Sequence, residues 1–307
     1  MFKKINIKEI RESLALLVIA AIVGTIVSFV AQLFIISAKN IYDFIFNNEN
    51  FIVTIDIGNL SLNLVPLLIC VPSSLLVGLL MYKLKLPRWF GPADTIYAAH
   101  HHGGILDLKG GFGSTLASFI SISGGASVGI YGPLVHFGAT VSSFVRRQKF
   151  IPKIPHDIII GSGVAAAISA GFGAPLAGII FAHETVLRHF SMKAVAALAI
   201  SSMAANFSAT KIGIVSPPLL LTAVPFDMGD IIVSLGIIGP LAAIVAILFM
   251  KLVLFTGTIP TKINIKNWQA PIIAGFACGI CGLVFSEILG LGTDVLMSVI
   301  TTQLLSG

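Results

Sequence analysis

The sequence predicts an all-α integral membrane protein with broken, tilted and re-entrant helices. Composition, long apolar runs and glycine–proline interruptions of those runs support this prediction. Of the 307 residues, 56% are hydrophobic and 10% are charged, and the mean hydropathy is +0.99. A soluble domain carries about 25% charged residues, so this chain has too few to cover a surface that faces water. Lipid is the solvent that suits such a composition.

Apolar runs identify the segments that are expected to cross the membrane, because a spanning helix needs about 20 apolar residues. The candidates are 14–36, 62–81, 116–145, 158–182, 194–207, 231–255 and 270–289. The first run is too long for the apolar region of a signal peptide, so it is interpreted as a spanning helix. Several other runs have an unsuitable length or contain glycine and proline, and 91–133 is the most interrupted stretch.

Basic residues give the chain a net charge of +6, but they do not form one patch. They lie in short loops between apolar runs, a pattern that membrane topology sets, and this argues against nucleic acid as a partner. The amino end, the loop 83–88 and the turn 146–153 are rich in Lys and Arg. The positive-inside rule therefore predicts that these segments, including the N terminus, are cytoplasmic. The expected location is the inner membrane of a bacterium.

Cysteine and histidine do not suggest a metal site. Cys278 and Cys281 form a C-x-x-C pair inside a glycine-containing apolar run, where small residues favour helix packing over redox or metal chemistry. His100, His101 and His102 are consecutive, so their side chains point in different directions, and a solvated cluster is favoured over ligation.

Broken helices suggest a site for an anion. A helix that begins inside the membrane leaves its first N–H groups without intrahelical partners, and these groups carry roughly half a positive charge. Such a helix start binds anions without a basic side chain. The first motif, 124–135, reads GGASVGIYGPLV. Its glycines permit a close approach of the backbone, and Pro133 suits the first turn of a helix that runs toward Arg146. A simple re-entrant turn is the alternative.

The second motif, 161–184, reads GSGVAAAISAGFGAPLAGIIFAHE. It predicts a helix of small residues, a break near Gly173 and Ala174, and a new helix that starts at Pro175. For 165–170 the interpretation is close helix packing alone.

Together the two motifs resemble the chloride channel and transporter (CLC) family. The first is similar to the family's G-x-x-x-G-[RK]-E-G-P stretch. The second is similar to its G-x-x-A-G-x-x-x-x-F-x-A-P-L-[AS]-G-x-x-F-x-x-E stretch, which Gly173, Ala174, Pro175 and Glu184 match in part. The resemblance reaches from the first span to about Leu296. It implies an inverted-repeat helical fold, a homodimer, and an anion path in each subunit that helix amino ends line.

The resemblance also implies roles for single residues. Tyr131 stands where the family has its gating glutamate, and the residues around it that are expected to bind the anion are Gly129, Ile130, Gly132 and Pro133. Thr185 stands where family antiporters have an inner proton-transfer glutamate. Tyrosine has a pKa near 10, so both carboxylates for proton exchange are missing. His136 or His183 remain as alternative proton carriers, although packing roles are favoured for both.

The family's inner anion site uses a G-S-G-x-P turn, which the resemblance places at 91–95. Pro92 stands in place of the serine, so Gly91, Pro92 and Thr95 are expected to supply backbone N–H groups or a hydroxyl. Asp94 is expected to cap the following helix.

The resemblance divides the chain into a cytoplasmic segment 1–13, a first repeat 14–225, and a region 226–307 that holds a connecting helix and the start of a second repeat. Residues 292–296 echo 91–96, while the family's later motifs are absent. The second repeat is therefore expected to be incomplete.

The sequence thus predicts a CLC-type chloride channel that passes anions without proton coupling and needs no cofactor besides the transported ion. A proton-coupled chloride or fluoride antiporter is one alternative, and an inactive fragment or structural half-protein is another. An enzyme is not expected, because no Ser/His/Asp, paired-Asp or His-Glu-x-x-His constellation is present. The expected partners are inorganic anions, the lipid bilayer and a second copy of the chain.

Overall fold

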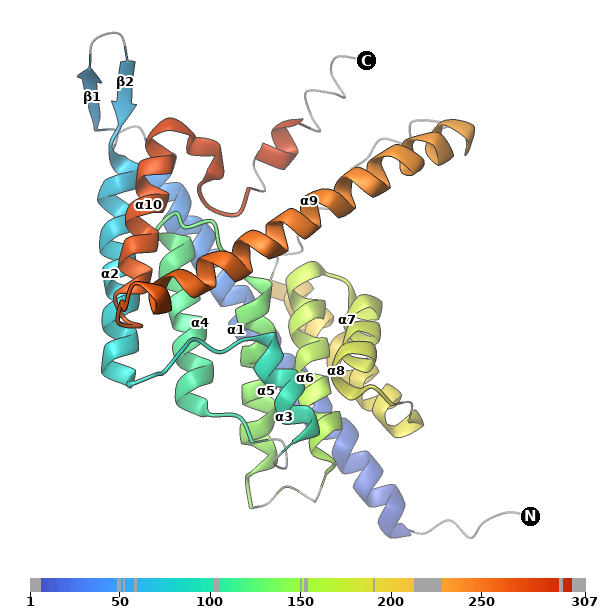
Figure 1. The fold of residues 1–307 in the computed structure, drawn as a ribbon. Helices are drawn as coiled ribbons and strands as arrows, with labels where there is room; N and C mark the ends of the chain where they lie inside the picture. Colours follow the sequence, from blue (N-terminus) through green and yellow to red (C-terminus); the bar gives the residue numbers. More distant parts are fainter. Residues whose placement is uncertain are drawn as a thin grey trace.

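The fold was analysed in a computed structural model. It describes residues 7–48, 51, 53–57, 60–101, 105–149, 151, 154–189, 191–212, 228–292 and 295–299. Within these ranges the chain is almost entirely helical, as Figure 1 shows. The first half contains α1 (Ile7–Phe46), β1 (Thr54–Ile57), β2 (Leu60–Asn63), α2 (Val65–Leu84), α3 (Pro92–His100), α4 (Leu108–Ser123) and α5 (Tyr131–Arg146). The second half contains α6 (His156–Phe172), α7 (Pro175–Phe181), the π-helix η3 (Ala182–Leu187), α8 (Met192–Ile212), α9 (Met228–Lys262), α10 (Ala270–Val284) and the 3₁₀ turn η4 (Ser286–Ile288).

Four of the described helices are long and apolar enough to cross a membrane, which agrees with the predicted class. They correspond to Ile10–Phe46, Val65–Leu84, Met192–Ile212 and Leu235–Pro260. Shorter apolar helices lie between and after them, at His156–Phe172, Pro175–Leu187 and Ala270–Val284. A mixture of full spans and short helices is what the interrupted apolar runs predict.

Three of the apolar runs are not continuous helices, and for two of them the sequence predicted a new helix start within the run. The run 116–145 is divided into α4 and α5 by a non-helical segment at 124–130, where Gly125 has a φ of +87°. The run 158–182 is divided at Gly173, whose φ is +64°, and a new helix starts at Pro175 as predicted. The run 270–289 ends as an α-helix at Val284. Glycine adopts these left-handed conformations without a steric cost.

A short antiparallel hairpin of β1 and β2 precedes α2, and the sequence analysis did not predict it. Thr54 pairs with Asn63 and Ile57 pairs with Leu60. The prediction of a helix from Leu62 is therefore wrong, because Leu62 lies in β2. Polar and apolar residues alternate in TIDI and LSLN, as expected for strands. Each strand has only four residues, so the alternation is too short to predict a strand with certainty from the sequence.

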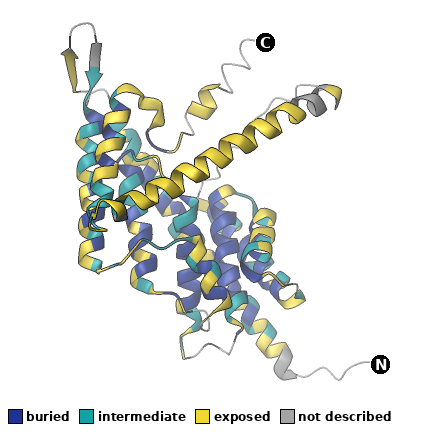
Figure 2. Cartoon of the chain, in the orientation of Figure 1, coloured by how far each residue is buried: buried dark blue, intermediate teal, exposed yellow. Residues whose placement is uncertain are grey.

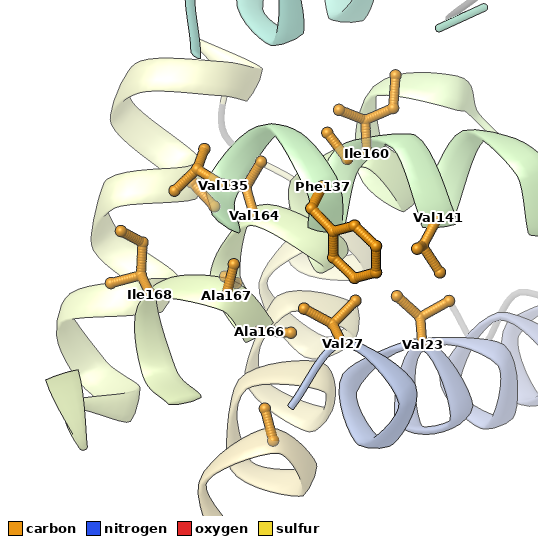
Figure 3. Packing of buried hydrophobic residues seen from close by; sticks show 14 of the residues in the cluster. Val23, Val27, Val135, Phe137, Val141, Ile160, Val164, Ala166, Ala167 and Ile168 are labelled. Atoms are coloured by element: carbon orange, nitrogen blue, oxygen red, sulfur yellow. The ribbon is translucent and has the colours of Figure 1, made fainter. Parts of the chain in front are cut away.

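The core surrounds α6, which is buried along almost its whole length (Figure 2). Helices α1, α5 and α8 pack around it. Figure 3 shows Phe137 of α5 next to Val23 and Val27 of α1, with Val164 and Ala167 of α6 nearby. This packing also fixes the positions of the two ends of α6 and of the start of α5. The candidate site lies at the start of α5.

Small residues bring these helices into backbone contact. A Cβ added at Gly138 of α5 would collide with the carbonyl oxygen of Gly163 in α6, and one at Gly24 of α1 would collide with that of Ser201 in α8. Close approach through small residues is a common way for helices to associate in lipid. Hydrogen bonds between helices add to it, since Gln32 donates to the Ala170 carbonyl at 2.6 Å and Ser28 to the Ala205 carbonyl at 2.7 Å.

Helix α9 stands apart from this core. Residues 235–259 are exposed on every side, including many large apolar side chains, and Figure 2 shows the helix crossing the molecule as an exposed element. An exposed helix that is apolar all round suits a lipid or protein surrounding. The predicted boundary between 225 and 226 lies outside the described residues.

Candidate functional site

The candidate site begins at the segment 124–130, which leads from α4 into α5. The Gly125 amide donates to the Ile122 carbonyl, and the Gly125 carbonyl accepts a 3.0 Å hydrogen bond from the Gly290 amide. This bond joins the break to the turn after α10. A left-handed glycine at this point directs the chain back into the protein, so α5 begins inside the helical bundle.

Helix α5 starts at Tyr131, two residues before the predicted start, and Pro133 is its third residue. Ile130 occupies the N-cap position, and its apolar side chain makes no capping hydrogen bond. Pro133 has no amide hydrogen. The first turn therefore presents the amides of Tyr131 and Gly132 without a side-chain cap, which is the arrangement that the anion-site prediction requires.

An open cavity of about 570 Å³ lies at this helix start. Pro92 at the start of α3, Tyr131 and Gly132 at the start of α5, and Ala174 directly before α7 all line it. Its remaining lining residues are apolar: Val135, Ile168, Phe172, Ala177 and Phe181. The starts of three helices that are distant in sequence thus meet at one cavity.

An aromatic pair forms part of the cavity wall. The rings of Tyr131 and Phe172 are stacked, with centroids 3.7 Å apart and planes at 20°. Phe172 ends α6 immediately before the break at Gly173. Sequence analysis assigned no role to Phe172, although it matches the phenylalanine of the second motif. The sequence could not indicate this contact, because Tyr131 and Phe172 lie on different helices.

The start of α3 is organised by its own carboxylate. Asp94 is the third residue of α3, not the residue before it as the capping prediction expected, and its carboxylate accepts a 2.9 Å hydrogen bond from the amide of Gly91, the N-cap residue. Arg88 donates to Asp94 as well, with one of the two bonds at 3.0 Å. The Phe90 amide donates to the Ser114 hydroxyl at 2.8 Å. The amide of Gly91, one of the predicted anion ligands, is therefore already occupied by Asp94.

The pKa of Asp94 follows from these contacts. Helix α3 lies outside the four candidate spans. Burial raises the pKa of the carboxyl, but the hydrogen bonds from Arg88 and the Gly91 amide outweigh this effect, so the pKa of Asp94 lies below its ordinary value. The group is thus held in its charged form.

Thr95 and His136, which were selected for different reasons, contact each other. The Thr95 hydroxyl lies 3.0 Å from Nδ1 of His136, and both residues are buried. The Phe90 ring lies parallel to the imidazole, with centroids 6.2 Å apart. The Thr95 hydroxyl therefore joins α3 to α5, and it does not line the cavity at Tyr131.

A second, more polar cavity of about 300 Å³ lies on the other side of His136. Its charged and polar lining residues are Arg88, Asp94, Tyr97, His101, Asp107 and His136. It thus gathers ionisable side chains, in contrast to the apolar cavity at Tyr131.

The end of the second motif adopts an unusual helix. Ala182–Leu187 is a π-helix that contains His183, Glu184 and Thr185. Glu184 is exposed, whereas Thr185 is half-buried. Short π-helical segments are frequent at functional sites. Position 185, where family antiporters have a glutamate, carries a threonine hydroxyl and no carboxylate.

Metal ligation receives no support within the described ranges, where no group of three His, Cys, Asp or Glu side chains gathers. His100 and His101 are exposed at the end of α3, and His102 lies outside the described residues. Cys278 lies in the seam between α10 and α2 with Cys70, whose thiol contacts the Gly124 carbonyl at 3.2 Å. The packing interpretation of these cysteines is consistent with this position.

Comparison with known proteins places these features in context. A sequence profile described as voltage gated chloride channel matches residues 73–306. The chain is 25% identical over 296 residues to the voltage-gated ClC-type chloride channel ClcB of Escherichia coli, a match that covers 93% of this chain and 68% of that protein.

Two solved structures share the fold. A slow cyanobacterial Cl⁻/H⁺ antiporter aligns with a TM-score of 0.70 and 22% identity over 91% of this chain and 66% of its own. A CLC-type fluoride/proton antiporter aligns with a TM-score of 0.72 and 16% identity over 96% of this chain and 71% of its own. The chain spans about two thirds of the length of these relatives.

Proposed function

The chain belongs to the voltage-gated chloride channel (CLC) family, and from this membership we propose that it carries chloride or a similar small anion passively across a membrane. The observation that carries the proposal is the cavity at which the starts of α3 and α5 and the residue before α7 meet. A dehydrated anion in such a cavity would be stabilised by backbone amides and helix dipoles, without a basic side chain.

Within this proposal the anion contacts the start of α5. Gly129, Ile130, Gly132 and Pro133 surround Tyr131 there, and Ile130 leaves the first-turn amides without a side-chain cap. Gly91, Pro92 and Thr95 contribute differently from the original expectation. Pro92 lines the cavity, while the Gly91 amide is bonded to Asp94 and the Thr95 hydroxyl contacts His136. We therefore place the main anion contact at α5.

The absence of proton coupling is proposed from two side chains. Tyr131 occupies the position of the gating glutamate, and Thr185 that of the inner proton-transfer glutamate. Neither hydroxyl titrates near neutral pH, so neither accepts and releases a proton during a transport cycle. Tyr131 instead acts as an aromatic gate over the cavity.

A proton-coupled antiporter is the second candidate function. The two solved structures compared above are described as antiporters, one for chloride and one for fluoride. His136 is buried beside Thr95 and lines the polar cavity, which is a suitable place for a proton carrier because imidazole titrates near neutrality.

The two functions are separated by one experiment. The protein is reconstituted into liposomes loaded with chloride, a potassium ionophore sets the voltage, and chloride and pH are recorded together. We expect chloride efflux without proton movement. Proton movement in fixed proportion to chloride would contradict the passive mechanism, and its loss in His136→Gln would identify the carrier. Absence of efflux would favour the inactive or structural half-protein.

The setting of the protein is part of the proposal. We place it in the inner membrane of a bacterium with its N terminus in the cytoplasm, as a homodimer in which each subunit has its own path. The basic residues support this orientation, because the end of α2, which carries basic residues, lies away from the hairpin (Figure 1).

A further inference from the structure

We propose that Phe172 is a positioning residue that holds the Tyr131 ring across the cavity, in a slot that Gly171 leaves free for it. This inference rests on the proposed function, because it explains how an aromatic gate is kept closed. It assigns roles to two residues of α6 that neither bind the anion through their backbone nor titrate.

The slot is defined by two contacts. The Tyr131 and Phe172 rings stack with centroids 3.7 Å apart, and a Cβ added at Gly171 would lie 2.9 Å from two carbon atoms of the Tyr131 ring. Real Cβ atoms essentially never approach a ring this closely, so any larger residue at 171 would displace the Tyr131 ring. Phe172 and Gly171 together thus determine where the ring lies.

Phe172 is held in place through its backbone. Helix α6 is enclosed by α1, α5 and α8, and its backbone touches that of α5 at Gly163 and Gly138. The helix ends at Phe172, where Gly173 adopts a left-handed conformation and Pro175 starts α7. The backbone on both sides of Phe172 is therefore constrained, while its ring is 47% exposed.

Tyr131 is the member with freedom to move. A Cβ added at Gly129 would meet no atom within 4 Å, and one at Gly132 would approach only Pro92, at 3.7 Å. The open cavity of about 570 Å³ that Tyr131 lines gives its ring space to move. An aromatic pair contributes modestly beyond its buried area, so the stack is strong enough to favour one position and weak enough to break thermally.

Val135 reports the position of the ring. It lies one helical turn after Tyr131 on the same face of α5, lines the same cavity, and is only 4% exposed. If the Tyr131 ring leaves its slot, Val135 becomes accessible to a small reagent in the cavity. Accessibility at this position is a measurement that does not depend on transport.

The test uses Val135→Cys in a protein whose native cysteines, Cys70, Cys278 and Cys281, are replaced by serine. The rate of modification by a small water-soluble methanethiosulfonate is measured in the full chain. Adding Phe172→Ala, Phe172→Leu or Gly171→Ala should raise the rate roughly three- to tenfold, as expected for loss of one aromatic contact. Phe172→Tyr, which preserves the stack, should restore the parent rate.

Matched controls are Phe207→Ala, an exposed aromatic residue of α8, and Gly236→Ala, where an added Cβ meets nothing within 4 Å. Both should leave the rate unchanged. The inference is overturned if the Phe172 and Gly171 variants modify at the parent rate, whether or not Tyr131→Ala accelerates modification. Chloride efflux is measured separately. Efflux with unchanged modification rates would refute the positioning role alone, and altered rates without efflux in any variant would refute the proposed function alone.

Discussion

Asp94 shows how a single side chain determines what a helix start can bind. Its carboxylate accepts from the Gly91 amide at 2.9 Å and pairs with Arg88. A carboxylate in this position stabilises the helix and satisfies the amide that a free anion would otherwise use. The start of α5 has no such carboxylate in its first turn. This difference between two helix starts is the residue-level reason to place the anion at α5.

The Asp94 contacts predict an acid-dependent loss of stability. Because the folded pKa of Asp94 is lowered, its contribution is fully present above the unfolded value, about 3.9, and is lost as the pH falls through the lower folded pKa. Thermal melting of the detergent-solubilised protein between pH 7 and pH 3 measures it. Asp94→Asn should melt lower at pH 7 and converge toward the parent in acid. Parallel curves at all pH values would contradict this assignment.

The Thr95–His136 contact predicts a loss of stability that is independent of transport. Thr95→Val keeps the shape of the buried side chain and removes the hydroxyl that meets Nδ1 of His136 at 3.0 Å. Leaving a buried polar atom unpaired costs about 1–3 kcal/mol. Thr210→Val is the control, because that hydroxyl is exposed and bonds only within its own helix. Equal melting temperatures of the two variants would argue against a role of Thr95 in joining α3 to α5.

At the scale of elements, proline and glycine made the helix starts predictable. The start of α7 at Pro175 was predicted to the residue, and that of α5 to within two, because proline is favoured in the first turn of a helix. The β1–β2 hairpin was missed since four-residue strands produce a weak alternation, and the ends of α4 and α10 were missed since apolar composition continues past them. Hydropathy identifies membrane segments but does not show where a helix stops inside them.

The contact of α5 with α6 predicts that Gly138 is essential for packing. A Cβ at this position would collide with the Gly163 carbonyl oxygen, so Gly138→Ala forces the two helices apart. Overpacking of this kind lowers the free energy of unfolding by about 1–3 kcal/mol. Gly236→Ala in α9 adds the same methyl group where nothing lies within 4 Å. The first variant should therefore melt at a lower temperature and the second should not, and a reversed order would refute the close contact.

For the whole molecule, the fold class and the family were available from composition and two motifs, whereas the arrangement of the site was not. Tyr131 meets Phe172, and Thr95 meets His136, only because α3, α5 and α6 pack together. The sequence identifies these residues but does not show which of them are in contact. Pro92 and Ala174 reach one cavity for the same reason. Tyr131 was thus identified from a motif, but the residues that contact it are a property of tertiary packing.

The orientation of the whole molecule is a prediction that labelling can decide. Basic residues of the α2–α3 connection, Lys83, Lys85 and Arg88, lie at one end of α2, and the hairpin lies at the other (Figure 1). Because such residues are retained in the cytoplasm, a cysteine at exposed Pro87 should be protected from a membrane-impermeant maleimide in intact cells. A cysteine at exposed Ile55 of β1 should react.

Both positions are tested as single cysteines in the background without native cysteines, and both should react after the membrane is permeabilised. Labelling of Pro87→Cys but not Ile55→Cys in intact cells would reverse the orientation. The basic α2–α3 connection, and the polar cavity that Arg88 lines, would then lie toward the outer side of the membrane. The side of the membrane on which the α2–α3 connection lies is therefore decided by this one measurement.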